Sequence, residues 1–142
     1  MITDIYNKRI LGLAASIPRT KRLENPDATA MAFSKMCGSR VAVDLDMDGD
    51  VITGFGQEVK ACALGQAASS VVGQHIVGST SGEFRQVADE MRKMLKGDGR
   101  PPSGKWKDLE VLEPVRDYKA RHTSTLLVFD AVEDAISQIE GD

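Results

Sequence analysis

Apolar side chains recur at helical spacing in four segments of the chain, as expected where an α-helix buries one face. These segments cover residues 2–14, 61–77, 81–96 and 127–139. Pro18 follows the first segment and Gly97 follows the third, and both residue types are typical of helix ends. The second segment consists mainly of alanine, leucine, serine and valine, so we expect it to form a central, buried helix.

Between the first two helical segments, apolar and polar residues alternate, which predicts strands with one buried face. The alternation is weak in ATAMAFSK (residues 28–35) and strong in RVAVDLDMDGDVITGF (residues 40–55). Asp48-Gly49 in the second stretch is a tight-turn signal, so residues 40–55 are predicted to form a β-hairpin. A helix, then strands, then further helices favour an α+β fold, in which helices pack on one face of a small antiparallel sheet.

The composition is that of an ordinary globular protein. With 142 residues the chain can bury a core without disulfides, so we expect residues 1–142 to form a single domain. Hydrophobic residues make up 42%, charged residues 27%, and the formal net charge is −3. No basic patch argues for nucleic acid, and no apolar stretch is long enough to cross a membrane. Charges interrupt the first apolar segment, which argues against a secretory signal and predicts a cytoplasmic protein with reduced thiols.

Several motifs that carry chemistry in other proteins are incomplete in this chain. The aspartates of DLDMDGD (residues 44–50) match the early positions of a calcium loop, but the position that needs a bidentate glutamate is Phe55. We therefore interpret this acidic run as the solvated face of the hairpin. His75 and His122 stand alone, and the sequence contains neither a triad ordering nor a glycine-rich phosphate loop. The sequence thus predicts that the protein is not an enzyme.

The remaining candidate chemistry lies in the chain's two cysteines. Cys37 precedes the hairpin and Cys62 follows it, so an antiparallel return would bring both thiols to one end of the sheet. If Cys62 lies in the first turn of its helix, the unpaired N–H groups there attract negative charge, and metal binding and sulfur transfer both use the thiolate. Two other interpretations stay open. The cysteines are buried, unreactive side chains, or they form a redox disulfide.

The segments around both cysteines resemble the iron–sulfur cluster assembly scaffolds of the NifU N-terminal, IscU and SufU type. Cys37-Gly38-Ser39 is similar to the first-cysteine motif of that family, Cys-Gly-Asp, and the alanine- and serine-rich helix after Cys62 is similar to the segment that begins at its second cysteine. IYNKRILGLAASIPRTKRLENPDATA looks like the family's leader, and LEVLEPVRDYKARHTSTLLVFDAVEDAI looks like the region of its third cysteine. The resemblance covers nearly the whole chain, and the insert GDGRPPSGKWKDLEVLEPV is closest to the SufU-like branch.

This resemblance implies the fold of the family, a three-stranded antiparallel sheet with helices on one face, and a metal site at its motif positions. Cys37 and Cys62 are the implied ligands for an iron–sulfur cluster, iron or zinc. The third-cysteine position falls on Ser124, or on Thr123 if the register slips by one, and the aspartate position falls on Ser39. Hydroxyls are poor ligands for soft metals, so two ligand positions of the family are vacated at Ser39 and Ser124.

Two functions are compatible with this ligand set. In the first, the chain is a cluster assembly scaffold, and two chains in a homodimer supply the four thiolates that a [2Fe–2S] cluster takes. In the second, the chain binds no metal and acts as an interaction module. The resemblance implies a cysteine desulfurase and apo iron–sulfur client proteins as partners in both cases.

Overall fold

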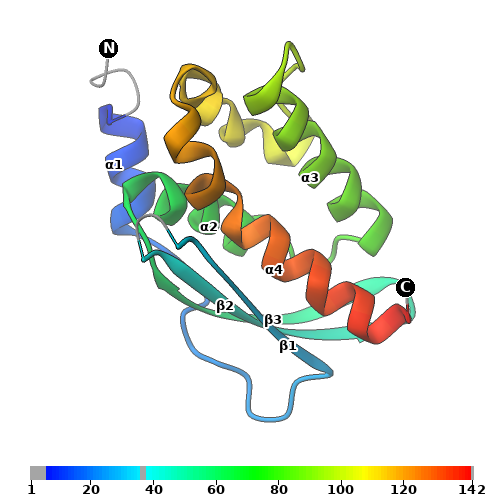
Figure 1. The fold of residues 1–142 in the computed structure, drawn as a ribbon. Coiled ribbons are helices and arrows are strands. Elements are labelled where there is room, and N and C mark those ends of the chain that lie inside the picture. The colour runs from blue at the N-terminus through cyan, green and yellow to red at the C-terminus, as the bar shows by residue number, and fades with distance from the viewer. Residues whose placement is uncertain (1–5, 36–37, 142) are drawn as a thin grey trace.

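The computed structural model describes residues 6–35 and 38–141. Its elements are α1 (Lys8–Ala15), β1 (Ala28–Phe33), β2 (Arg40–Asp48), β3 (Val51–Lys60), α2 (Ala63–His75), α3 (Ser81–Lys96), the 3₁₀ segments η2 (Gly104–Asp117) and η3 (Lys119–Arg121), and α4 (His122–Glu140). The strands form one antiparallel sheet in the order β1-β2-β3, and the helices lie on one side of it (Figure 1). The predicted α+β fold is confirmed.

The hairpin forms because the apolar residues of β2 alternate in step with the pleat of the sheet. Val41, Val43 and Leu45 are fully buried beneath the helices. Gly49 has φ +62° and lies in the two-residue turn between β2 and β3, a conformation that favours glycine. The predicted hairpin is confirmed, and its second strand continues past the expected end at Phe55 to Lys60.

The helices share one core above the sheet. α4 packs across β1 and β2, while α2 lies between α1 and α4. The central helix predicted over residues 61–77 is confirmed in shorter form, because α2 begins at Ala63 and ends at His75. Among the described residues, no helix combines the length and the apolar character needed to cross a bilayer.

The segment between α3 and α4 is more ordered than its sequence pattern predicts. Where only a short stretch around residues 109–112 was expected, the chain forms the 3₁₀ segment η2, which buries Trp106, Leu109, Val111, Leu112 and Val115. Pro114 lies inside this segment, and proline lacks the N–H that a regular α-helix would need there. The indole Nε1 of Trp106 donates to Glu83 Oε2 at 2.9 Å, which joins η2 to the first turn of α3.

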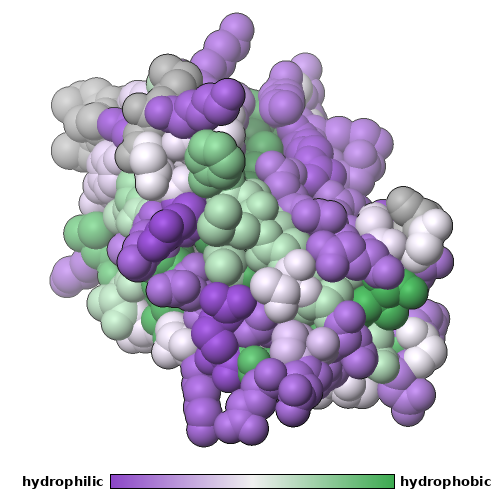
Figure 2. All heavy atoms as spheres, turned by 60° about the horizontal axis from the view of Figure 1, so that its bottom comes forward, coloured by the Kyte–Doolittle hydropathy of each residue, from purple (hydrophilic) through white to green (hydrophobic). Residues whose placement is uncertain are grey.

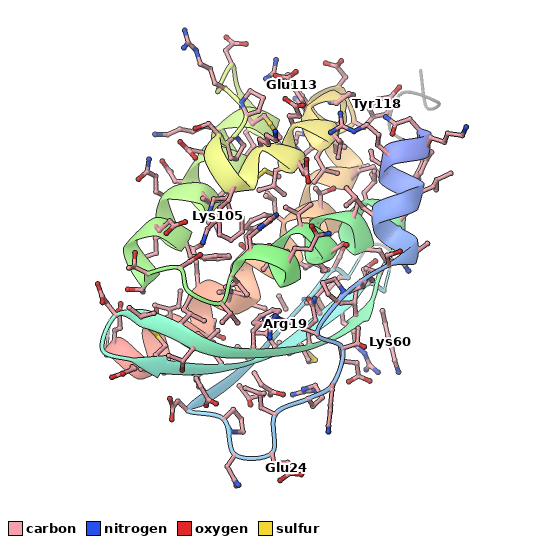
Figure 3. The ribbon with its side chains drawn as sticks, turned by 180° about the vertical axis from the view of Figure 1, so that it is seen from behind. Arg19, Glu24, Lys60, Lys105, Glu113 and Tyr118 are labelled. Atoms are coloured by element: carbon pink, nitrogen blue, oxygen red, sulfur yellow. The ribbon has the colours of Figure 1, made fainter. Side chains whose placement is uncertain are left out.

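The connection between α1 and β1 crosses the other face of the sheet. Figure 3 shows it descending from Arg19 to Glu24 at its tip. The backbone N–H of Gln57 donates to the Arg19 carbonyl at 3.0 Å. A Cβ at Gly56 would lie 2.6 Å from the Lys21 carbonyl oxygen, so glycine allows this segment to lie directly on β3.

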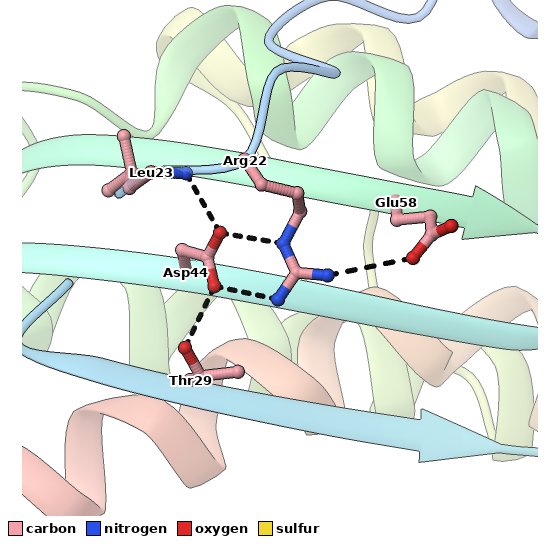
Figure 4. Close-up of polar contacts among 5 residues, drawn as sticks. All are labelled: Arg22, Leu23, Thr29, Asp44 and Glu58. Atoms are coloured by element: carbon pink, nitrogen blue, oxygen red, sulfur yellow. Dashed lines mark hydrogen bonds and ion pairs between the residues drawn. The ribbon is translucent and has the colours of Figure 1, made fainter. Parts of the chain in front are cut away.

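The interpretation of the acidic run as a solvated face is wrong at Asp44. This side chain is 2% exposed and lies beneath the crossing segment. Its carboxylate accepts two hydrogen bonds from Arg22, at 2.6 and 2.8 Å, one from the Leu23 N–H and one from the Thr29 hydroxyl (Figure 4). The guanidinium of Arg22 also lies 3.5 Å from Glu58 Oε1. The buried carboxylate is compensated by these bonds and links the crossing segment to the sheet.

Candidate functional site

The two predicted ligand segments meet at one end of the sheet. Arg40 at the start of β2 pairs with Lys60 at the end of β3. Ser39 therefore lies at the same end of the sheet as Cys62, as the hairpin argument predicts. Cys37 lies outside the described residues.

Cys62 occupies the N-cap position of α2. Its backbone is extended, with φ −67° and ψ 170°, and its side chain makes no capping hydrogen bond. Its carbonyl accepts the first helical bond from the Gln66 N–H at 2.9 Å. The thiol is free and half-buried. The start of a helix thus presents the sulfur at the edge of the core, where a ligand can still reach it.

Ser124 lies directly against Cys62, across the junction of α2 and α4. The Cys62 thiol donates to Ser124 Oγ with a sulfur–oxygen distance of 3.7 Å. The Ser124 hydroxyl in turn donates to the Arg121 carbonyl at 3.3 Å, and the side chain is 2% exposed. The neighbouring Thr123 is exposed. Of the two residues predicted for the third-cysteine position, Ser124 is the one whose side chain contacts Cys62, and the assignment itself stays a prediction.

Gly65 makes this contact possible and was not recognised from the sequence. A Cβ at this position would lie 2.9 Å from the Ser124 carbonyl oxygen and 2.9 Å from the Cβ of Ala61. Only glycine lets the first turns of α2 and α4 approach this closely. The signal in the sequence is a glycine inside an otherwise helical run, which often marks close packing.

Ser39 belongs to the turn that joins β1 to β2. Its carbonyl accepts the Ser34 N–H at 2.8 Å, and the N–H of Gly38 donates to the Ser34 carbonyl at 2.9 Å. Gly38 has φ +71°, which favours glycine at this point of the turn. Ser39 is buried, with 4% of its surface exposed. The turn thus places Gly38 and Ser39 at the end of the sheet that also holds Cys62.

Neither histidine adds a ligand to this group. The Nε2 atom of His122 lies 3.0 Å from the Val115 carbonyl oxygen and 3.1 Å from that of Arg116, so the ring joins η2 to α4. His75 packs edge-on against Trp106 with ring centroids 5.9 Å apart. Over the described ranges, no group of three or more histidine, cysteine or acidic side chains is arranged to hold a metal ion.

Comparison with known proteins places this geometry in a family. No family model matches the sequence. A crystal structure of a nitrogen-fixing NifU-like protein (N-terminal) from Brucella abortus is 55% identical, covers 99% of this chain and 98% of its own, and superposes with a TM-score of 0.97. The Thermotoga maritima protein named iron–sulfur cluster assembly scaffold protein IscU is 26% identical over 137 residues, which are 95% of this chain and 94% of the relative.

A third relative carries a different name. The Bacillus subtilis protein named zinc-dependent sulfurtransferase SufU is 25% identical over 124 residues, which are 87% of this chain and 84% of the relative. These matches cover nearly the same residues as the resemblance found in the sequence, and they confirm it. The chain belongs to the NifU N-terminal, IscU and SufU-like family of iron–sulfur cluster assembly scaffold proteins.

Proposed function

We propose that this chain is a scaffold on which an iron–sulfur cluster is assembled and from which it passes to apo proteins. The observation that carries the proposal is the thiol of Cys62 at the start of α2, in contact with Ser124, the residue predicted for the third-cysteine position. The name of the Thermotoga maritima relative supports the same function. The cluster is the cargo of this protein, and Cys37 and Cys62 are the proposed ligands.

The number of ligands determines how the cargo is held. One chain has two thiols, whereas a [2Fe–2S] cluster takes four sulfur ligands from protein. Ser124 offers only a neutral hydroxyl, which binds soft metals weakly. We therefore propose that two chains share one cluster, with Cys37 and Cys62 of each chain as ligands.

Ser124 has a positioning role in this proposal. Its oxygen accepts the thiol proton of Cys62 while its own proton points to the Arg121 carbonyl. When Cys62 loses its proton to bind iron, the serine hydroxyl can rotate and donate to the thiolate instead. In this proposal Ser124 thus stabilises the thiolate of Cys62.

Zinc-dependent sulfur transfer, which the name of the Bacillus subtilis relative states for that protein, fits this chain less well. A stable zinc site usually takes four protein ligands, mostly cysteine and histidine. Cys62 is the one such side chain that the described residues place at the site, because both histidines contact η2 instead. That the protein is not an enzyme stays a prediction.

The partners of a scaffold follow from its cargo. Assembly needs a supply of sulfur as well as iron, and the finished cluster needs apo iron–sulfur proteins that accept it. We propose a cysteine desulfurase and such clients as partners, acting in the cytoplasm.

Anaerobic reconstitution with iron and a sulfur donor tests the scaffold function. We expect a sulfide-dependent visible chromophore, two iron ions per pair of chains, and elution as a dimer. Cys37→Ser and Cys62→Ser should each abolish the chromophore, while Ser34→Ala, a change in the same turn that keeps both thiols, should retain it.

A colourless, iron-free protein under these conditions would overturn the scaffold proposal. It would favour the second function, a fold retained to bind a desulfurase or a client without metal. A chromophore on monomers would retain the scaffold function but contradict the shared cluster.

A further inference from the structure

A pocket lies where the end of α3, the 3₁₀ segments η2 and η3, and the start of α4 meet. Its volume is about 510 Å³, which is in the range of small-molecule sites. The end of α3 and the start of α4 lie at the end of the molecule away from the sheet (Figure 1). The pocket is therefore separate from the sheet face in Figure 2, where hydrophobic residues gather in the middle of the view. The side chains that matter for its chemistry are Leu95, Lys96, Asp98, Arg116, Lys119 and His122.

The lining of this pocket carries more positive than negative charge, although the chain as a whole is negative. Lys96 comes from the last turn of α3, Arg116 from η2 and Lys119 from η3, so the positive groups belong to three different elements. Asp98 is the one acidic side chain among the described residues of the lining. Lys96 and Lys119 are exposed, and neither forms an ion pair with another described residue. Positive groups that surround a hollow attract an anion into it.

The guanidinium of Arg116 is held in place by the chain around it. Its Nε donates to the Met94 carbonyl at 2.9 Å, and its Nη2 donates to the Gly99 carbonyl at 3.0 Å. Nη2 also lies 3.4 Å from Glu113 Oε2, so two carboxylates in all oppose the three positive groups. Nη1 donates to no described residue. Because the side chain is already fixed, its remaining donors can bind an anion with little loss of conformational entropy.

The imidazole of His122 adds a hydrogen-bonding atom at the same pocket. This residue is 7% exposed, and its Nε2 lies 3.0 and 3.1 Å from two carbonyl oxygens. Carbonyl oxygens only accept, so Nε2 carries a proton and Nδ1 of the neutral ring is an acceptor. No described residue donates to Nδ1. Polar atoms of buried side chains usually have a partner, and a hydroxyl group in the pocket would supply this one.

We propose that this pocket binds a phosphate group, either as the free ion or at the end of a small molecule. The anionic oxygens of hydrogen phosphate would accept from Lys96, Arg116 and Lys119, and its P–OH would donate to Nδ1 of His122. Sulfate has the same shape and charge but no hydroxyl at neutral pH, so the pocket should prefer phosphate. The inference goes beyond the proposed function, because none of these residues is a proposed cluster ligand.

The test follows the imidazole resonances of the isotope-labelled full chain while inorganic phosphate is added at constant pH and ionic strength. We expect the resonances of His122 to shift. Those of His75, the chain's other histidine, should stay, because its ring packs against Trp106. Sulfate should bind at least about fivefold more weakly, as the loss of one hydrogen bond predicts. Glycerol 3-phosphate is titrated separately, and the tighter of the two phosphates tells whether the pocket favours an ester or the free ion.

Paired lysine variants test the charges of the pocket. Lys96→Gln/Lys119→Gln should weaken phosphate binding by at least about fivefold, because the anion loses two charged partners. The matched control is Lys21→Gln/Lys107→Gln, which removes two exposed lysines outside the pocket and changes the net charge equally. This control should bind phosphate as the parent chain does.

Three results would overturn the inference. They are no shift of the His122 resonances with phosphate, equal affinity for sulfate and phosphate, or equal weakening by both lysine pairs. Cluster reconstitution with iron and sulfide distinguishes failure of the proposed function. Lys96→Gln/Lys119→Gln should form the chromophore as the parent chain does, and Cys62→Ser should lose the chromophore but retain phosphate binding.

Discussion

At the scale of single residues, the contact between Cys62 and Ser124 decides how many sulfur ligands the site offers. Ser124→Cys would place a second thiol beside Cys62, since the present oxygen lies 3.7 Å from the sulfur. We expect this variant to retain zinc against a chromogenic chelator at least about tenfold better than the parent chain, because an added thiolate contributes strongly to zinc affinity.

Thr123→Cys is the matched control for that change. It adds the same thiol one residue earlier, but Thr123 is exposed whereas Ser124 is buried against Cys62. Its zinc retention should stay near that of the parent chain. If both variants retained zinc equally well, a cysteine at residue 123 would serve as a zinc ligand as well as one at residue 124.

The buried carboxylate of Asp44 leads to a second prediction at this scale. Asparagine would keep one of the two acceptor oxygens and would turn an NH2 donor toward some of the present donors, which are Arg22, the Leu23 N–H and the Thr29 hydroxyl. We expect Asp44→Asn to lower the free energy of unfolding by about 2–4 kcal/mol at neutral pH, measured by urea denaturation. Asp48→Asn, an exposed change on the same strand, should alter it by less than about 0.5 kcal/mol.

The pH dependence of that difference follows from the pKa of Asp44. The hydrogen bond from Arg22 holds this pKa below its ordinary value of 3.8, although burial acts in the opposite direction. Between the ordinary and the lowered value the unfolded chain binds more protons, so stability decreases as the pH falls. The difference in free energy of unfolding between Asp44→Asn and the parent chain should therefore be constant above about pH 5. It should shrink as the pH falls below 3.8. If the difference in free energy of unfolding persisted at lower pH, the charge of Asp44 would not be its cause.

At the scale of elements, the junction of α2 and α4 depends on Gly65. Gly65→Ala would place a Cβ 2.9 Å from the Ser124 carbonyl oxygen, a backbone atom that can move only with its helix. We expect a loss of about 1–3 kcal/mol in the free energy of unfolding, as overpacking of a core usually causes. The control is Gly82→Ala in α3, where a Cβ would meet no atom within 4 Å, so it should be neutral or stabilising. Equal effects of the two changes would contradict close packing at the junction.

The elements themselves were predictable where periodicity was strong. Leu45 and its neighbours predicted the hairpin, and the hydrophobic stripe of α3 predicted that helix up to Gly97. The hairpin register also placed Ser39 and Cys62 at one end of the sheet. Periodicity could not predict η2, because the buried residues of this 3₁₀ segment, among them Trp106 and Val115, follow neither the α-helical nor the strand repeat.

Contacts between distant segments were the part that the sequence could not predict. Asp44 looks solvated in an alternating strand, and its burial depends on a crossing segment that itself has no apolar pattern. In the same way, the distance between Cys62 and Ser124 depends on how two helices pack and not on either local sequence. Such contacts are set by tertiary packing, which local patterns do not determine.

At the scale of the whole molecule, one core joins the sheet, the helices and η2, and the chain's single tryptophan reports on it. Trp106 is 3% exposed, packs edge-on against Phe84, and donates to Glu83. We expect tryptophan fluorescence and far-ultraviolet circular dichroism to give the same urea midpoint, because η2 cannot leave this core without exposing the residues beneath it. Glu83→Gln should lower both midpoints together. An earlier fluorescence transition would show that η2 separates first and that the segment between α3 and α4 opens independently of the sheet.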